Sequence, residues 1–580
     1  MAYFDFEKTG ICSKTENSLK SESFVKIKDG EVSEYKLILD FGKDIYPSKY
    51  SLIWEENQVD MMGFWSSKGF FEKHITADWY MRNEVSRTAT GMPVISIFNK
   101  GNENRITIAL SDPANATVIS AGVVEEKGNI RFKIDLFPDI SPLMSKYEVI
   151  IRIDRRSIPF YQSLKDTKAW WGEIGFKNCY IPESTRLPTY SAWYSYHQEI
   201  DVEAIIEECR HAKELGMDTI IIDDGWQTDD SSRGYAYCGD WKISKKKIPD
   251  MKYFVDSIHK LGMKFVIWFS VPYMGFKSEN FERFKGKYLK KREHMGASVL
   301  DPRYKEVRDF LVDIYCGYVK EYGWDGLKLD FIDSFSPDET SSTDYEKMDC
   351  VSVEEGVSRL LSEVSSSLKK INPEFMIEFR QSYVGPIMAQ YGNFFRVTDC
   401  PGDPMINRIG CLNLRLVMGG ASVHSDMLMW NKNDTPEGVG YQLLACMFGV
   451  PQISVRFSDI SEEQKKLLKY FLSFWKEHRN AILDGELEVF DVEANYSMAR
   501  SKKDGECVAV LYQSVVAKAE DDCVSYIFNS SGKRGVYVEN SKEAAYELYS
   551  IYGEKQGEGK IPAGVSKLDV DICGMVKIIQ

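Results

Sequence analysis

The two ends of the chain share a pattern of short alternating apolar and polar runs. Residues 105–110 and 147–153 alternate in this way, and Gly, Asn and Asp separate such runs through the first 185 residues. The pattern returns after residue 483, as in residues 507–512 behind an Asp504-Gly505 turn. Alternation with a period of two is typical of strands with one buried face. It predicts an N-terminal β-sandwich over residues 1–185 and a small C-terminal antiparallel β-domain over residues 483–580.

The middle of the chain, residues 186–482, follows a different pattern. Short apolar runs alternate with stretches of helical spacing, such as residues 202–212 before Gly216 and the run behind a capping box at residues 352–355. The apolar runs that we interpret as strands are residues 191–194, 219–222, 265–268, 327–329, 375–377, 395–398, 422–424 and 453–455. Eight strand-then-helix units over about 290 residues match a TIM barrel in number and size. The sequence therefore predicts an α/β fold, a (β/α)8 barrel between two β-domains.

Composition and charge narrow the class of protein. Hydrophobic residues make up 43% and aromatic residues 13% of the 580 positions, which is enough for a sizeable core. The net charge of -14, without any long Lys/Arg block, argues against a nucleic-acid partner. The N-terminal residues contain no signal-peptide-like apolar run, and no stretch of about 18 apolar residues follows. We expect a cytoplasmic protein without a membrane partner.

Cysteine and histidine spacing gives no metal signature. The twelve cysteines form no CxxC pair, and the seven histidines form no HExxH motif. We expect reduced thiols, no bound metal and no cofactor.

Polar residues with catalytic potential follow the predicted barrel strands. In a TIM barrel the active site lies at the carboxyl ends of the strands. The residues at or near these ends are Asp223, Asp224, Lys328, Asp330, Arg380, Arg396, Asp399, Asp426 and Arg456, with indole rings at Trp193, Trp226, Trp241 and Trp268. Carboxylates and cations hydrogen-bond sugar hydroxyls, and indoles stack on the C–H face of a sugar. The set predicts a small-molecule carbohydrate as the substrate.

Two of these carboxylates fit the needs of glycoside hydrolysis. The reaction uses one ionised carboxylate to attack the anomeric carbon and one protonated carboxyl to assist the leaving group. Asp330 fits the first role, because Lys328 lies two residues earlier on the same strand face and can hold it ionised. Asp399 fits the second, and we expect the negative charge of Asp330 to raise its pKa.

Four segments resemble glycoside hydrolase family 36, the α-galactosidase and raffinose-synthase group, and more remotely family 27. They are Ile222-Asp223-Asp224-Gly225-Trp226-Gln227, Gly239-Asp240-Trp241 leading to Gly262–Phe269, Lys328-Leu329-Asp330-Phe331, and Arg396-Val397-Thr398-Asp399-Cys400-Pro401. The resemblance implies a retaining hydrolase that cleaves terminal α-linked galactose or a close relative such as α-N-acetylgalactosamine. It also implies that Asp330 is the nucleophile and Asp399 the acid/base, and that Asp223, Asp224, Lys328 and Arg396 bind the sugar ring.

The expected substrate-binding set also contains Trp193, Trp241, Trp268, Arg380 and Asp426. For Trp241 and Trp268 a place in the core stays open as the alternative, and for Asp426 a role behind the residues that touch the sugar.

The chain departs from the resemblance in two loops and in one spacing. Many members carry Phe-Glu-Pro-Glu after the third strand, where this chain has Phe269-Ser270-Val271-Pro272, and Cys-Ser-Gly-Gly-Gly after the fifth, where it has Glu378-Phe379-Arg380-Gln381-Ser382. In many relatives the acid/base lies four residues after the arginine, whereas Asp399 lies three after Arg396. Asp403 and Asp426 therefore stay open as alternatives. Asp403 precedes Pro404, which favours a helix cap.

Three other functions stay open at this point. A transglycosidase of the raffinose-synthase type would use the same intermediate with a sugar acceptor. An aldolase-like barrel would form a Schiff base on Lys328, although the neighbouring Asp330 would keep that lysine charged. A carbohydrate-binding protein without catalysis would not need both carboxylates. A homo-oligomer is also left open.

Overall fold

The N-terminal part is a sandwich of two antiparallel sheets in the computed structural model, which describes residues 2–5 and 11–580. The first sheet contains β1 (Ala2–Asp5), β2 (Cys12–Thr15), β5 (Tyr50–Asn57), β11 (Asn129–Leu136), β10 (Thr117–Val124) and β7 (Arg82–Ser86). The second contains β3 (Ser21–Lys28), β4 (Val32–Ile45), β12 (Met144–Asp154), β9 (Asn104–Leu110), β8 (Val94–Phe98) and β6 (Gly63–Ser66). Their inner faces share one apolar core. The period-two pattern is thus explained by burial of alternate residues between the sheets.

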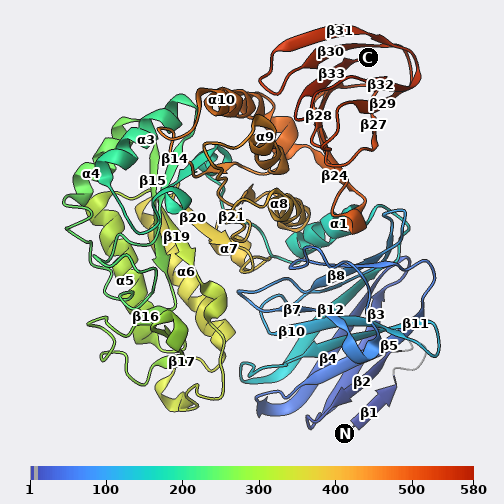
Figure 1. The fold of residues 1–580 in the computed structure, drawn as a ribbon. Coiled ribbons are helices and arrows are strands. Elements are labelled where there is room, and N and C mark those ends of the chain that lie inside the picture. Colours follow the sequence, from blue (N-terminus) through green and yellow to red (C-terminus); the bar gives the residue numbers. More distant parts are fainter. Residues whose placement is uncertain (1, 6–10) are drawn as a thin grey trace.

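A helix that the sequence pattern missed follows the sandwich. Helix α1 (Phe160–Glu173) lies between the N-terminal sheets and the barrel, where the pattern was interpreted as strands only (Figure 1). Its buried face includes Phe160, Leu164 and Trp171, at spacings of three to four residues.

The middle part is the predicted barrel, and the fold class is confirmed. In order around the sheet the parallel strands are β13 (Thr189–Ser191), β14 (Thr219–Ile222), β15 (Lys264–Ser270), β19 (Gly326–Asp330), β20 (Met376–Arg380), β21 (Phe394–Arg396), β22 (Ser422–His424) and β23 (Gln452–Ile453). Bridges from His424 to Val450 and from Leu428 to Ile453 bring the last two strands together. All eight predicted strands overlap these. The first, residues 191–194, overlaps only at Ser191 and is wrong beyond it, because the chain turns into the short helix α2 (Trp193–Tyr196).

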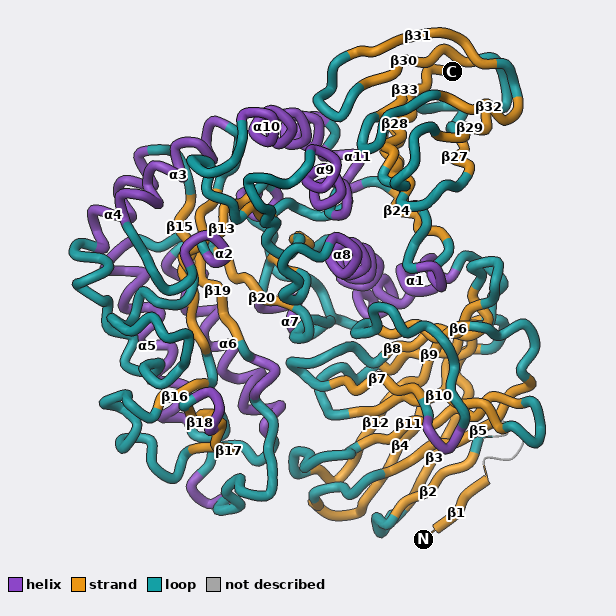
Figure 2. The backbone as a smooth tube through the Cα atoms, in the orientation of Figure 1, coloured by secondary structure: helices purple, strands orange, loops and turns teal. Residues whose placement is uncertain are grey.

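Helices surround the barrel strands (Figure 2). They are α3 (Val202–Glu214), α4 (Met251–Lys260), α5 (Lys305–Tyr322), α6 (Val353–Ile371), α7 (Met388–Tyr391), α8 (Pro404–Met418), α9 (Pro436–Ala445) and α10 (Glu462–Glu477), followed by α11 (Arg479–Asp484). The Ser352 hydroxyl accepts the Glu355 N–H at 3.3 Å and caps α6, while the Glu355 side chain pairs with Arg359 rather than reaching back to residue 352. The predicted capping box is therefore only half formed.

A small sheet of β16 (Tyr273–Gly275), β17 (Tyr288–Arg292) and β18 (Ala297–Leu300) extends the loop after β15.

The C-terminal part contains two sheets around a core of their own. One contains β24 (Glu486–Phe490), β25 (Met498–Lys503), β26 (Glu506–Leu511), β28 (Val524–Asn529), β33 (Met575–Ile579), β30 (Ala544–Tyr549) and β31 (Lys555–Ile561), and the other β27 (Val516–Lys518), β29 (Val536–Asn540) and β32 (Gly564–Leu568). Pairing is antiparallel except between β26 and β28 and between β27 and β29. The predicted Asp504-Gly505 turn joins β25 to β26, with positive φ at both residues.

The domain boundaries at residues 185 and 482 stay predictions. All twelve cysteines are free thiols. Among the described helices, none combines the length and hydrophobicity that a membrane crossing requires.

Candidate active site

Three neighbouring strands end in charged residues at the same end of the barrel. Asp330, Arg380 and Arg396 are the last residues of β19, β20 and β21. Asp223 directly follows β14, and Asp399 lies three residues beyond β21. Because parallel strands end on one side of a barrel, the topology collects these groups at its carboxyl end.

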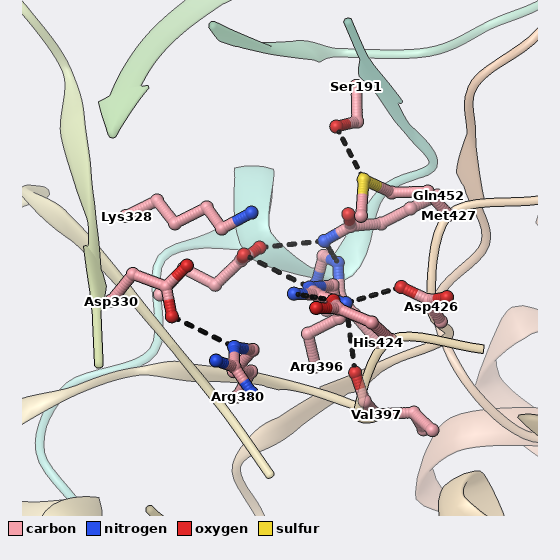
Figure 3. Close-up of polar contacts among 12 residues, drawn as sticks. Ser191, Lys328, Asp330, Arg380, Arg396, Val397, His424, Asp426, Met427 and Gln452 are labelled. Carbon is pink, nitrogen blue, oxygen red and sulfur yellow. Dashed lines mark hydrogen bonds and ion pairs between the residues drawn. The ribbon is translucent and has the colours of Figure 1, made fainter. Parts of the chain in front are cut away.

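Asp330 is buried and held by three side-chain donors and by the backbone N–H of Phe331, which donates to its Oδ1 at 2.8 Å. Arg380 Nε donates to its Oδ1 at 2.8 Å, Tyr383 Oη to the same oxygen at 2.5 Å, and Trp268 Nε1 to Oδ2 at 3.0 Å. Figure 3 shows Arg380 turned toward Asp330. Burial alone would raise the pKa of Asp330, but the charges of Arg380 and Lys328 outweigh it and hold that pKa well below its usual range. The carboxylate is therefore ionised and fixed in orientation.

Arg396 joins three carboxylates. Its guanidinium pairs with Asp399 at 2.9 Å and with Glu378 at 3.5 Å. It also pairs with Asp426, and Figure 3 shows this contact. Arg396, Glu378 and Asp426 are each at most 1% exposed, whereas the Asp399 side chain is 52% exposed. Asp399 is thus the carboxylate of this group that a ligand can reach.

The pKa of Asp399 contradicts the sequence-based expectation. Burial and the charge of Asp330 act to raise it, but Arg396, Arg380 and Lys328 lower it further, and the net shift is downward. The prediction of a raised pKa is wrong for the free protein, because it counted the nearby carboxylate and not the cations brought in by the neighbouring strands.

Asp223 and Asp224 face different partners. Lys328 Nζ donates to Asp223 Oδ2, so the lysine that was expected to serve Asp330 forms its ion pair with Asp223 and acts on Asp330 through its charge alone. Asp224 accepts hydrogen bonds from Gln198 at 2.6 Å and Gln227 at 2.7 Å. Burial raises the pKa of Asp224 to about 6.

The tryptophans do not form the expected stacking surface. Trp241 is buried in an aromatic cluster with Trp226 and Phe269, so its predicted place in the pocket is corrected to the core. Trp268 is also buried and reaches the site only through its Nε1 bond to Asp330. Trp193 is half-buried on α2 with its edge against His197.

The carboxylates of the two alternative acid/base residues already accept hydrogen bonds from other groups of the protein. Asp403 caps α8, where its carboxylate accepts the N–H groups of Met405 and Ile406 at 2.9 Å each. Asp426 is fully buried and accepts from Arg396, from Cys400 N–H at 2.6 Å and from Tyr194 Oη at 3.0 Å. The geometry gives Asp426 a positioning role rather than the substrate contact that the sequence suggested.

Sequence reasoning missed Glu378 and Tyr383. Glu378 points into the same network, accepting from Gln452 at 2.7 Å, and burial raises its pKa. Its place on β20 two residues before Arg380 puts both on one strand face, and this period-two signal was available. Tyr383 lies in the loop behind β20, where no sequence period predicts its contact with Asp330.

The barrel sequence matches known proteins. Residues 185–379 match the melibiase family, a range that includes Asp223, Asp224 and Asp330 and ends before Asp399. The chain is 31% identical over 152 residues to the α-galactosidase Mel36A of Lactobacillus acidophilus, which is 25% of this chain and 19% of that protein. It is 26% identical over 129 residues to the α-galactosidase AgaA of Geobacillus stearothermophilus, 21% of this chain and 17% of that protein. The matched segments thus span less than a fifth of these relatives' own length.

Solved structures resemble the chain over its whole length. The galactosidase domain of the α-galactosidase–sucrose kinase AgaSK superposes with a TM-score of 0.65 at 12% identity, covering 100% of this chain and 81% of that one. A variant of AgaA from Geobacillus stearothermophilus in complex with raffinose gives a TM-score of 0.63 at 14% identity, covering 99% and 90%. The predicted resemblance to family 36 is confirmed over residues 185–379, and the three-part fold is shared with the solved structures.

Proposed function

We propose that this protein is a retaining glycoside hydrolase that releases terminal α-linked galactose, or a close relative of it, from a small carbohydrate. The observation that carries the proposal is the pair of Asp330 and Asp399 with Arg380 beside them. Arg380 pairs with Asp330 at 2.8 Å and Arg396 pairs with Asp399 at 2.9 Å, and the two arginines lie opposite each other on β20 and β21. The matches to α-galactosidases support the sugar class.

Asp330 is proposed as the nucleophile. An attacking carboxylate must be ionised and aimed, and the bonds from Arg380, Tyr383 and Trp268 provide both. In the first step an Asp330 oxygen forms a bond to the anomeric carbon while the bond to the leaving oxygen breaks.

Asp399 is proposed as the acid/base, because its side chain is exposed and it lies within the same cluster of charges. To act as the acid, Asp399 must carry a proton that it can pass to the leaving oxygen. Because Arg396 lowers the pKa of Asp399, substrate binding has to raise that pKa again. When Asp330 becomes an uncharged ester, Asp399 loses a neighbouring negative charge and its pKa falls further, which suits a base that takes a proton from water in the second step.

Asp223, Lys328 and Asp224 are proposed to bind hydroxyls of the ring. Asp223 and Lys328 present an acceptor and a donor side by side, and buried charged partners of this kind discriminate strongly between hydroxyl configurations. Arg380 lies against the proposed nucleophile, at a position of the strand-five loop where many relatives have a small residue. We propose that Arg380 helps to determine which group the sugar can carry on the carbon next to the anomeric carbon.

The test is an NMR time course with 4-nitrophenyl α-galactoside, in which galactose should appear first as the α-anomer. Product that appears first as the β-anomer would refute the two-aspartate double displacement. The 4-epimeric glucoside should show kcat/KM at least about 100-fold lower. Equal values would refute the galactose assignment. Adding free sugars and analysing the products measures how far transglycosylation competes with hydrolysis.

A further inference from the structure

A cavity of about 340 Å³ lies where the three parts of the chain meet. Its walls come from α1, from the end of α8 and from residues 483–487, which lead into β24. Figure 1 shows α1, α8 and β24 between the N-terminal sheets and the C-terminal part. Ser422, the first residue of β22, also lines the cavity, so it lies at the amino end of that strand. The proposed active site lies at the opposite, carboxyl ends of the strands.

The charged residues that line the cavity are Lys165, Lys168, Arg186, Arg415 and Asp484. Asp484 is already paired, because both of its oxygens accept from Arg186 at 2.6 and 2.7 Å. Lys168 donates to the neutral amide oxygen of Asn178 at 2.8 Å. Arg415 donates only to backbone carbonyls, those of residues 448, 482 and 483.

Three cations in this wall thus have no carboxylate within ion-pair distance. Over the described part of the chain, Lys165, Lys168 and Arg415 form no ion pair with a carboxylate. Burial lowers the pKa of Lys168 to about 8, lowers that of Lys165, and lowers that of Arg415 to about 10. All three are half-buried, and nearby carboxylates act on Lys165 and Arg415 only through space, so an anion in the cavity would give these cations a direct partner. This positive charge stands out in a chain with a net charge of -14.

We propose that this cavity binds a phosphate group between Lys165, Lys168 and Arg415, either as inorganic phosphate or as the phosphate of a small monoester. A compact dianion matches several converging cations, and lysine ammonium groups are common phosphate ligands. Gly419 and Gly420 form an exposed part of the rim and carry no side chains that could cover the opening. The volume lies at the lower end of the range for small-molecule sites, which leaves room beyond the phosphate itself.

The occupant would brace the junction of the three parts. It would link α1 to α8, and α8 begins directly after Asp403, close to the loop that carries Asp399. Because a ligand that binds only the folded state stabilises it, phosphate raises the melting temperature in this proposal.

The experiment titrates the full chain with inorganic phosphate and separately with glucose 6-phosphate. It follows heat of binding and melting temperature, with sodium chloride of equal ionic strength as the reference. Either phosphate should raise the melting temperature more than chloride does. In the double variant Lys165→Gln/Lys168→Gln, the dissociation constant should rise at least tenfold. The matched control is Lys245→Gln/Lys246→Gln, which removes two exposed lysines in a distant loop and should bind like the wild type.

The two probes distinguish the sources of the phosphate. Tighter binding of glucose 6-phosphate supports a monoester, and equal binding supports the free ion. The proposal is overturned if neither probe binds with a dissociation constant below about 10 mM, or if the double variant binds as the wild type does. If the double variant does not fold, the half-buried Lys165→Gln alone is titrated, and unchanged affinity there also overturns it.

Discussion

Asp330 ends β19 and Asp333 lies three residues beyond it, yet the pKa values of the two carboxyl groups are shifted in opposite directions. Arg380, together with Lys328, keeps the pKa of Asp330 low, whereas burial raises the pKa of Asp333. Asp330→Asn should therefore reduce kcat on aryl galactosides at least about 1,000-fold, because an amide cannot attack the anomeric carbon. Asp333→Asn, the matched control, changes a carboxylate that accepts a hydrogen bond from Ser382 Oγ at 3.1 Å, and should keep most of the turnover. Comparable kcat values for the two variants would contradict the nucleophile assignment.

Loss of Asp399 should depend on the leaving group. Asp399→Ala should lower kcat/KM by about 10²–10⁴-fold on galactosides with a sugar leaving group, which needs a proton to depart, and far less on nitrophenyl galactosides. Azide should restore turnover of the activated substrate and give the α-galactosyl azide. If azide instead rescued Asp426→Ala or Asp403→Ala, the acid/base role would move to that residue.

Asp223 and Asp224 should differ in how stability responds to substitution. Asp223→Asn leaves Lys328 without its ion-pair partner and should cost on the order of 3 kcal/mol of unfolding free energy.

Asp224→Asn should cost less unfolding free energy at neutral pH than at acid pH. The folded pKa of Asp224 is raised to about 6, so its contribution is present below its unfolded pKa and is lost as pH rises through 6. Denaturant unfolding at pH 4.5 and 7.5 measures both effects, and a pH-independent Asp224→Asn deficit would contradict the second.

At the scale of elements, Asp403 lies between the loop that carries Asp399 and the first turn of helix α8. Asp403 accepts two N–H groups in the first turn of α8, and Pro404 occupies the first helical position. Asp403→Ala should lower the unfolding free energy by about 1 kcal/mol, while Asp403→Asn retains the cap. Thermal unfolding of the two variants measures the difference. A loss of catalysis with unchanged stability in Asp403→Ala would show that the residue serves the reaction and not the helix.

At the scale of the whole molecule, Asn413 on α8 joins the three parts. Its Oδ1 accepts from Trp65 of the N-terminal sheets at 3.0 Å and from Tyr496 of the C-terminal part at 2.5 Å, and all three side chains are buried. Asn413→Leu leaves two buried donors unsatisfied and should cost on the order of 3 kcal/mol. Tyr496→Phe removes one bond and should cost about 1 kcal/mol. Calorimetry checks the order, and equal effects would show that the junction rests on packing.

The sequence by itself determined the layers of the fold and the end of the barrel that carries the charges. Alternation and apolar runs follow directly from which residues are buried, so they can be identified locally, as for β9, β14 and β22. Parallel strands all end on one side, so Asp330, Arg380 and Arg396 could be placed together without coordinates. Helix α1 and the turn after Ser191 were missed, because aromatic-rich segments fit either period and the surrounding structure decides between them.

Only the tertiary structure decided which of these groups is free to act. Asp399 and Asp426 have similar local sequence signals, yet one is half exposed and the other is enclosed by Arg396, Tyr194 and a backbone N–H. Trp241 packs into the core because the fold brings Trp226, which follows β14, and Phe269 of β15 against its ring. The downward shift in the pKa of Asp399 depends on cations of three strands. The burial of a group and the net effect of nearby charges on its pKa depend on many neighbours that are remote in the chain. No local sequence pattern can therefore predict them.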